Sequence, residues 1–108
     1  MIAPKGIEKY LPLSESTIYI VMSLTVPRHG YALMQHVKEI SKGTVKLGPG
    51  TLYGALSTLE KVGIIRMVSE ENRRKSYVLT DKGEKVLALQ AERIAVLNQN
   101  IQIAIDSQ

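Results

Sequence analysis

Two groups of side chains in this sequence have types and spacing suited to binding a polyanion such as nucleic acid. One is the run Arg73, Arg74 and Lys75, three consecutive cations that can neutralise phosphates. The other is a stripe of small, polar and basic residues along a helix that is predicted to begin near Pro49. Its members are Gly50, Thr51, Gly54, Ser57 and Lys61. The two groups together predict contacts with phosphates and with base edges.

The stripe lies opposite the apolar face of the same helix. At about 100° per residue, Leu52, Leu56 and Leu59 share a narrow arc and predict a side that faces the core. A helix enters a DNA major groove only when its outer face is small and lacks acids, and its N-terminus then presents partial positive charge. The alternative is an ordinary solvated helix face. A glycine inside a helix costs about 1 kcal/mol relative to alanine, so Gly54 favours the DNA interpretation.

The basic run also has two interpretations. On its own it is the solvated tip of a hairpin, where Glu70 and Glu71 offset only part of the charge. Beside a helix that reads a groove, the same cations clamp phosphates and position the protein without reading sequence. The surrounding pattern favours the phosphate contact.

Catalytic and metal chemistry find little support in the sequence. His29 and His36 are the two histidines, and pairing either with Glu15 or Glu39 leaves a metal without a third ligand. The sequence contains no Gly-rich phosphate loop, HExxH motif or GxSxG motif. We therefore expect no enzyme activity, no bound metal and no cofactor.

The composition limits the chain to one domain with one core. The 108 residues are 44% apolar, carry a formal net charge of +4 and include no cysteine, which excludes a disulfide framework. The sequence has no signal peptide and no apolar run approaching the roughly 20 residues of a membrane span, so we expect a cytoplasmic protein. Bases exceed acids in residues 1–80, whereas residues 81–108 carry three bases and four acids.

Three helices are predicted in the first half of the chain. An arm, residues 1–13, precedes Ser14, which is a good N-cap for a mostly apolar helix over Glu15–Val26. A turn at Pro27–Gly30 leads to a second helix that runs to about Ile40, with Leu33, Val37 and Ile40 predicted on its inner face. The third helix starts near Pro49 and ends at Val62–Gly63 in a left-handed glycine cap.

A hairpin and a long helix are predicted in the second half. The strands are Ile64–Ser69 and Ser76–Thr80, joined by a charged turn over residues 70–75. Thr80 then caps a helix from about Asp81 to Ile105. Its apolar seam, which Gln90 interrupts, extends beyond what a small domain can cover and therefore predicts a partner helix. The seam residues predicted to hold a dimer are Leu87, Ile94, Leu97 and Ile101.

Three helices followed by a hairpin with a basic tip are typical of a winged helix-turn-helix, in which the hairpin is the wing. The predicted fold class is α+β and mainly helical, with a long C-terminal dimerisation helix. Residues 1–80 form the predicted DNA-binding domain with its N-terminal arm, and residues 81–108 form the dimerisation helix.

Four strings in the sequence resemble a known family. They are HGY at 29–31, GTLYGAL at 50–56, LEKVGII at 59–65 and RKSYVLTDKG at 74–83. In order and spacing they are similar to the PadR family of bacterial transcriptional regulators, and the resemblance covers about residues 13–85. The resemblance implies a homodimeric winged-helix regulator, usually a repressor, that dimerises through C-terminal helices. It also implies that Tyr53 faces DNA and that His29 and Tyr31 lie near the phosphates.

The single tail helix is similar to the small-tailed branch of that family. Some members of the branch bind flat aromatic drugs against a tryptophan of the tail helix, and this chain has no Trp and no Phe. A small aromatic effector is predicted at a seam between the tail helices and the first helix, lined by Tyr19, Met22, Leu97 and Ile101. The alternative is a tightly packed seam that has no cavity.

The sequence therefore predicts a DNA-binding transcriptional regulator, a repressor that acts as a homodimer on an inverted repeat. The alternative is a winged-helix module that mediates protein interactions and does not bind DNA. Steep weakening of duplex DNA binding between about 50 and 200 mM salt would distinguish the two.

Overall fold

Side-chain caps begin three of the four α-helices in the computed structural model, which describes residues 6–108. Ser14 Oγ accepts a hydrogen bond from the Thr17 amide, His29 Nδ1 from Ala32, and Thr80 Oγ1 from Gly83. The elements in chain order are η1 (Glu8–Tyr10), α1 (Glu15–Ser23), β1 (Arg28–His29), α2 (Gly30–Ile40), α3 (Pro49–Lys61), β2 (Ile65–Glu71), β3 (Arg74–Leu79) and α4 (Asp81–Asp106). Residues 1–5 of the predicted arm lie outside the described residues.

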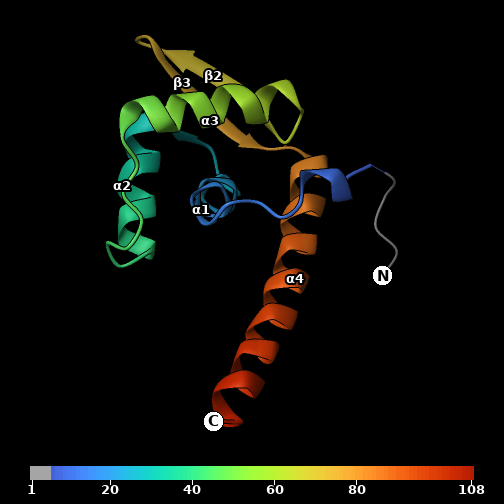
Figure 1. Cartoon of the computed structure of the whole chain (residues 1–108). Helices are drawn as coiled ribbons and strands as arrows, with labels where there is room; N and C mark the ends of the chain where they lie inside the picture. The colour runs from blue at the N-terminus through green and yellow to red at the C-terminus, as the bar shows by residue number, and fades with distance from the viewer. Residues whose placement is uncertain (1–5) are drawn as a thin grey trace.

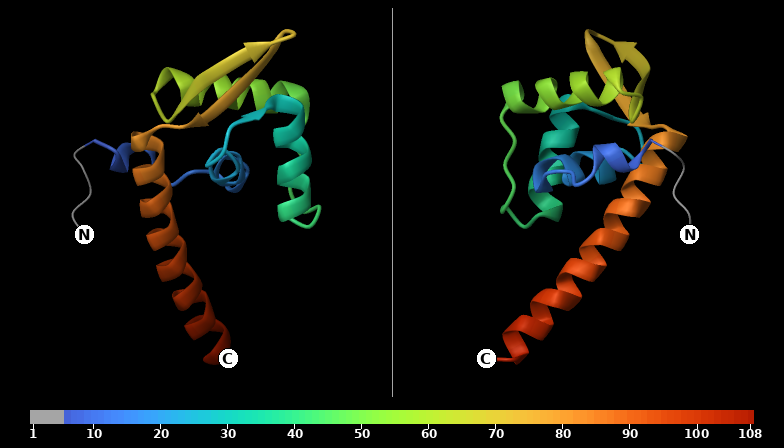
Figure 2. Two further views of the ribbon diagram at one scale, coloured as in Figure 1. Left: turned by 180° about the vertical axis from the view of Figure 1, so that it is seen from behind. Right: turned by 45° about the vertical axis from the view of Figure 1, so that its right-hand side comes forward.

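The elements form two parts (Figure 1). One part contains α1, α2, α3 and the strands, and the other is the long helix α4, whose first half packs on the same core. Helix α3 and the β2–β3 hairpin lie side by side along the top edge of this view, with α1 seen end-on below them and α2 at the left. Both views in Figure 2 show α4 running from the end of β3 away from that edge, so that its C-terminal half extends beyond the other elements. The arrangement confirms the predicted winged-helix fold with a long C-terminal helix.

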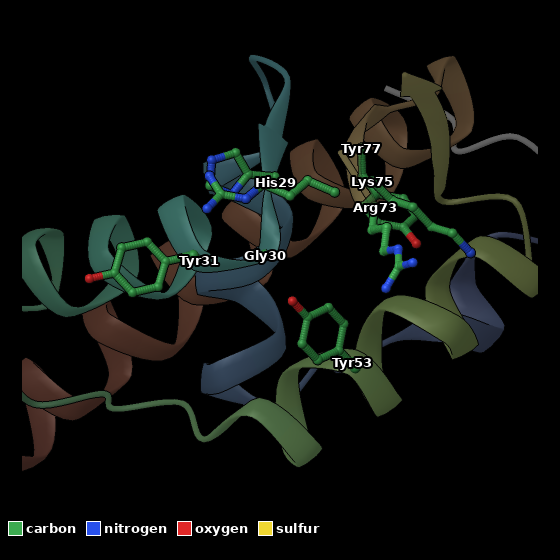
Figure 3. Close-up of a pocket in the computed structure, with 8 residues that line it drawn as sticks. His29, Gly30, Tyr31, Tyr53, Arg73, Lys75 and Tyr77 are labelled. Carbon is green, nitrogen blue, oxygen red and sulfur yellow. The ribbon is translucent and has the colours of Figure 1, made fainter. Parts of the chain in front are cut away.

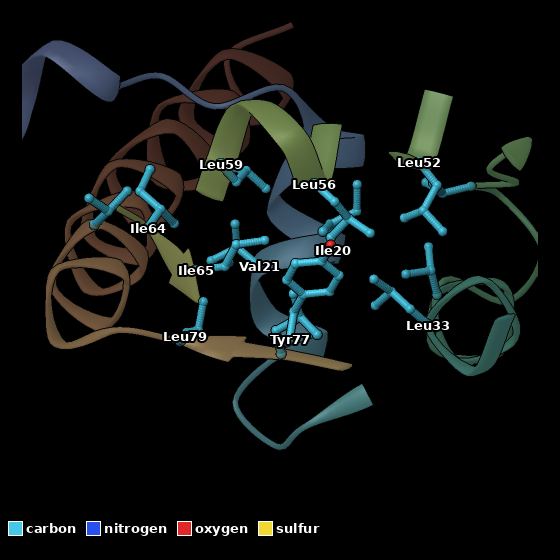
Figure 4. Packing of buried hydrophobic residues seen from close by; sticks show 14 of the residues in the cluster. Ile20, Val21, Leu33, Leu52, Leu56, Leu59, Ile64, Ile65, Tyr77 and Leu79 are labelled. Atoms are coloured by element: carbon cyan, nitrogen blue, oxygen red, sulfur yellow. The ribbon is translucent and has the colours of Figure 1, made fainter. Parts of the chain in front are cut away.

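The core is a cluster of buried aliphatic side chains from every major element. Figure 4 shows α1, α3 and the strands contributing to the same cluster, with Tyr77 of β3 among the aliphatic residues. Leu52, Leu56 and Leu59 of α3 are all buried, as their spacing predicts. Burial of each such side chain is worth about 1.5–3 kcal/mol, and this packing holds α3 against the sheet.

A third strand, β1, completes the sheet and was not expected from the sequence, which predicts only a hairpin. The strand order is β1-β3-β2, with both pairs antiparallel. Strand β1 has two residues, and it pairs Arg28 with Tyr77 and His29 with Ser76. Two residues are too few to show an alternating pattern, so only pairing with a distant segment reveals the strand.

The wing is the β2–β3 hairpin, and its turn is shorter than predicted. Its strands continue to Glu71 and from Arg74, which leaves only Asn72 and Arg73 in the turn. Both have positive φ, 51° and 65°, as a two-residue turn between right-twisted antiparallel strands requires. Arg73 therefore forms the tip, whereas Arg74 and Lys75 belong to β3 and lie opposite Glu71 and Glu70.

Two helix predictions in the first half of the chain are also corrected. Helix α1 ends at Ser23 rather than Val26, because the Leu24 carbonyl leaves the helix to accept a hydrogen bond from the Leu79 amide at 2.8 Å. Ile40 is 39% exposed rather than core-facing. It is the last residue of α2, and Figure 1 shows that end of α2 projecting beyond α1.

Hydrogen bonds and a close backbone approach hold the junction between β3 and α4. The Thr80 amide donates to the Ile64 carbonyl at 3.1 Å, and the Thr80 hydroxyl donates to the Gly63 carbonyl. Lys82 Nζ donates to the Val62 carbonyl at 2.7 Å. Lys82 Nζ also donates to the Tyr10 hydroxyl at 2.9 Å, and this hydrogen bond lowers the pKa of Tyr10. A Cβ added to Gly83 would collide with the Ile64 carbonyl oxygen and approach Leu79 to 3.2 Å.

Gly83→Ala is expected to lower the free energy of unfolding by about 1–3 kcal/mol, since backbone at Ile64 must move to admit the methyl group. Gly54→Ala is the matched control, because a Cβ there meets nothing within 4 Å and the helix gains up to about 1 kcal/mol. Urea unfolding of both variants measures the difference. Equal stability of the two variants would show that the junction tolerates a side chain.

Candidate nucleic-acid interface

The outward face of α3 carries the small, polar stripe that the sequence predicts. Gly50, Thr51, Gly54, Ser57 and Lys61 are all exposed. Tyr53 lies at the edge of this stripe and is 53% exposed. The exposed Glu60 lies beyond Tyr53, so the stripe itself contains no acid but has one at its margin.

Packing does not explain the glycines on this face. A Cβ built on Gly50 or Gly54 meets no atom within 4 Å, so neither glycine is needed for contact with the rest of the fold. Gly54 nevertheless lies in the helix interior, where glycine is destabilising. A bare backbone at an exposed helix position allows another molecule to approach closely.

A pocket of about 370 Å³ lies where α2, α3 and the wing meet (Figure 3). It brings together six residues that were predicted to contact DNA with two that were not. The predicted six are His29, Tyr31, Tyr53, Arg73, Arg74 and Lys75. The other two are Gly30 and Tyr77. The remaining predicted residues, those of the α3 stripe, do not line the pocket.

Gly30 allows Tyr53 to sit against the start of α2. A Cβ on Gly30 would lie 2.8 Å from Tyr53 Cζ and 3.0 Å from Cε1, and closer still to the hydroxyl. Figure 3 shows the Tyr53 hydroxyl directed at Gly30. The contact between these two residues therefore joins the N-terminus of α2 to the exposed side of α3.

The electrostatics of the pocket favour an anion. The first turn of α2 contains no acidic residue, and a helix N-terminus carries partial positive charge. Because His29 Nδ1 accepts from the Ala32 amide at 3.4 Å, a neutral His29 carries its proton on Nε2 and can donate it. On the wing, Arg74 and Lys75 have acids on the neighbouring strand, whereas Arg73 lies in the turn.

Tyr77 is one of the two pocket residues that sequence reasoning missed, since its place in a strand indicated only a core or interface role. The side chain is 8% exposed and also lines the pocket. Burial raises the pKa of the Tyr77 phenol, with a further contribution from the Glu60 carboxylate. The sequence does not predict β1. Tyr77 pairs with Arg28 of β1, and this pairing places Tyr77 beside the start of α2.

The predicted dimerisation residues lie on α4. Leu87 is half-buried, whereas Ile94, Leu97 and Ile101 are 43%, 59% and 46% exposed. At about 100° per residue they share one arc with the buried residues Val86 and Gln90. The arc that packs against the core in the first half of α4 thus continues as an uncovered apolar face in the second half.

The predicted effector seam is only partly assembled within one chain. A groove of about 640 Å³ on α4 includes Ile94 and Leu97, together with Pro12 and Gln90. Tyr19, Met22 and Ile101 do not line it. Gln90, which interrupts the apolar seam, is buried, and its Oε1 accepts a hydrogen bond from the Leu13 amide at 2.8 Å. This hydrogen bond connects the N-terminal arm to α4.

Within residues 6–108, no group of three His, Cys, Asp or Glu side chains is placed to hold a metal ion. No helix in the same residues is long and apolar enough to cross a membrane.

Comparison with known proteins finds relatives that match about two thirds of this chain. The chain is 36% identical over 75 residues to a 37.1 kDa protein in transposon TN4556 of Streptomyces fradiae, a match that covers 69% of this chain and 21% of that protein. It is 27% identical over 73 residues to the transcriptional regulator YqjI of Escherichia coli, covering 68% of this chain and 35% of that protein. The chain thus spans about a fifth to a third of the length of these relatives.

The fold is also found among solved structures. A PadR family transcription regulator from Clostridium difficile superimposes with a TM-score of 0.72 at 22% identity, covering 85% of this chain and 99% of that one. The family model described as the transcriptional regulator PadR-like family matches residues 18–89, which include α2, α3, the wing and the start of α4. The chain therefore belongs to the PadR-like family, whose members are transcriptional regulators rather than enzymes.

Proposed function

We propose that this chain is a sequence-specific DNA-binding repressor that acts as a homodimer on an inverted-repeat operator. The observation that carries the proposal is the combination of an acid-free, partly bare stripe on α3 with a cationic pocket at its edge. Tyr53 lines the pocket and lies at the edge of the stripe, so the two surfaces adjoin. In this arrangement α3 enters the major groove, and the wing and the start of α2 contact the flanking phosphates.

Dimerisation follows from the uncovered face of α4. Ile94, Leu97 and Ile101 continue the arc that is buried in the first half of the helix, and a second copy of α4 supplies matching apolar surface. Two-fold symmetry then places two α3 helices on half-sites about one helical turn apart. Release by a small aromatic ligand at the dimer seam stays a prediction, since Leu97 lines the α4 groove without Tyr19 or Met22.

The experiment that tests the proposal is genomic footprinting with the purified protein, followed by titration of the recovered operator at several salt concentrations. A specific site whose affinity falls steeply with salt supports the proposal. Absence of any duplex DNA binding at about 50 mM salt favours the protein-interaction module instead.

Arg73→Ala combined with Arg74→Ala is expected to weaken binding to all duplexes, because wing cations contact phosphates and carry no base information. The slope of log affinity against log salt should decrease by about one to two. Lys38→Ala with Lys85→Ala removes the same charge from exposed positions outside the pocket and serves as the control. Wild-type affinity and slope in a folded wing variant would remove the wing from the interface.

Ser57→Ala is expected to change the ranking of operator variants by about 1–3 kcal/mol at the contacted base, with little effect on non-specific affinity. Competition titrations with a set of single-base operator variants measure this ranking. Ser107→Ala, at the exposed C-cap of α4, is the matched serine control. If Lys61→Ala changes the ranking and Ser57→Ala does not, base contacts lie one turn further along α3.

Ile94→Glu with Ile101→Glu is expected to produce a monomer that no longer binds the operator, because charges replace the face that a second α4 covers. Ile103→Glu introduces a charge at an exposed position on the other side of α4, outside the groove, and should leave the dimer intact. Sedimentation equilibrium reports the oligomeric state. An intact dimer of the first variant would move the interface elsewhere, first to the N-terminal arm.

A further inference from the structure

The described part of the N-terminal arm, residues 6–13, is held against the rest of the fold at three points. Ile7 is 5% exposed and belongs to the core cluster. The Tyr10 hydroxyl accepts a hydrogen bond from Lys82 Nζ at 2.9 Å, and the Leu13 amide donates to Gln90 Oε1 at 2.8 Å. Figures 1 and 2 show η1 beside the first turns of α4. The arm is therefore a packed part of the fold.

Lys82 contacts the arm and the end of α3 with the same ammonium group. Its Nζ donates to the Tyr10 hydroxyl and also to the Val62 carbonyl, at 2.7 Å. An ammonium group carries three hydrogens, so it can make both hydrogen bonds at once. The Lys82 ammonium also lies 4.7 Å from the centre of the Tyr10 ring, within the range of a cation–π interaction. The arm thus holds the side chain that reaches α3.

The contact at Val62 is made where α3 ends. Val62 is the C-cap of α3, and the last carbonyls of a helix have no donor within the helix. A cation at this end also complements the negative end of the helix dipole. A Cβ built on Gly63 would lie 3.8 Å from Lys82 Cδ, so the lysine side chain runs along the turn that follows α3. Lys82 is therefore a fixed point for the C-terminal end of α3.

We propose that Tyr10 and Lys82 are positioning residues for the DNA-reading helix. The arm holds Lys82, and Lys82 holds the C-terminal end of α3 through the Val62 carbonyl. The proposal rests on the proposed function, because it takes α3 as the helix that reads DNA. Neither side chain lines the pocket or belongs to the α3 stripe, so both act on DNA binding through the position of α3.

The part of α3 that depends on this contact carries residues of the stripe. Lys61 is the last residue of the helix, and Ser57 lies about one turn before it. At its other end the arm reaches the α4 groove, which Pro12 lines together with Ile94 and Leu97. The arm therefore extends from the face proposed for the second copy to the side chain that holds α3.

Two substitutions test the proposal. Tyr10→Phe removes the hydroxyl and keeps the ring, whereas Lys82→Met removes both hydrogen bonds and keeps a side chain of similar length. Operator affinity should fall about threefold or more in each variant, as for other substitutions that act on a binding site without touching the ligand. In the Lys82→Met background, Tyr10→Phe should cause no further loss, because its effect passes through Lys82. Lys85→Met, at an exposed lysine near the start of α4, removes the same charge and should bind as the wild type does.

Two further measurements separate positioning from stability and from dimerisation. Affinities are compared under conditions in which urea unfolding shows every variant to be folded, and sedimentation equilibrium should show that Tyr10→Phe remains a dimer. In the free protein labelled with ¹⁵N, the amide resonances of Gly54 and Ser57 should shift in Tyr10→Phe and stay unchanged in Lys85→Met. A loss of stability alone leaves the resonances of the folded state in place.

A folded, dimeric Tyr10→Phe variant with wild-type operator affinity would overturn the proposal. A further loss of affinity from Tyr10→Phe in the Lys82→Met background would also overturn it, since the effect would then bypass Lys82. Dissociation of Tyr10→Phe into monomers would place the action of the arm at the dimer interface instead. If the wild type binds no DNA, the proposed function fails, and the amide resonances still decide whether the arm positions α3. Unchanged resonances of Gly54 and Ser57 in Tyr10→Phe would then overturn the proposal.

Discussion

The carbonyl oxygen of Ile64 lies where α3, the wing and α4 meet. It follows α3, accepts a hydrogen bond from the Thr80 amide, and lies against the Cα of Gly83. Lys82 adds a hydrogen bond to the Val62 carbonyl at the end of α3. Because Gly83 has no side chain, the first turn of α4 approaches the backbone that connects α3 to the wing. The angle of α4 to α3 is therefore set by backbone contact.

This junction links the dimer interface proposed on α4 to the DNA interface proposed on α3. A change in the angle between two α4 helices would move each α3 through the contacts at Ile64, Thr80 and Gly83. An effector that binds at the dimer seam alters DNA affinity only if it binds more tightly to one angle between the α4 helices than to another. The rigid connection at Ile64 provides a physical route for such an effect.

One position where this chain departs from good local design lies on the proposed DNA-binding side. Gly54 weakens α3 without any packing reason. Local inconsistencies of this kind are expected at functional sites, where a ligand supplies the missing contact. By contrast, Gly83 and Gln90 depart from helix and core preferences for structural reasons, since Gly83 admits the Ile64 carbonyl and Gln90 binds the Leu13 amide.

The sequence by itself determined the helices, the hairpin and the apolar face of α3, because caps and hydrophobic spacing act between residues only a few positions apart. Ser14, Thr80 and Gly63 lie at the predicted helix ends, and the four strings at 29–83 indicated the family. Tertiary structure alone decided strand β1, the early end of α1, the contact of Gly30 with Tyr53 and the place of Tyr77 in the pocket. Each of these depends on a hydrogen bond or a close approach between residues far apart in the chain, which leaves no periodic pattern in either segment.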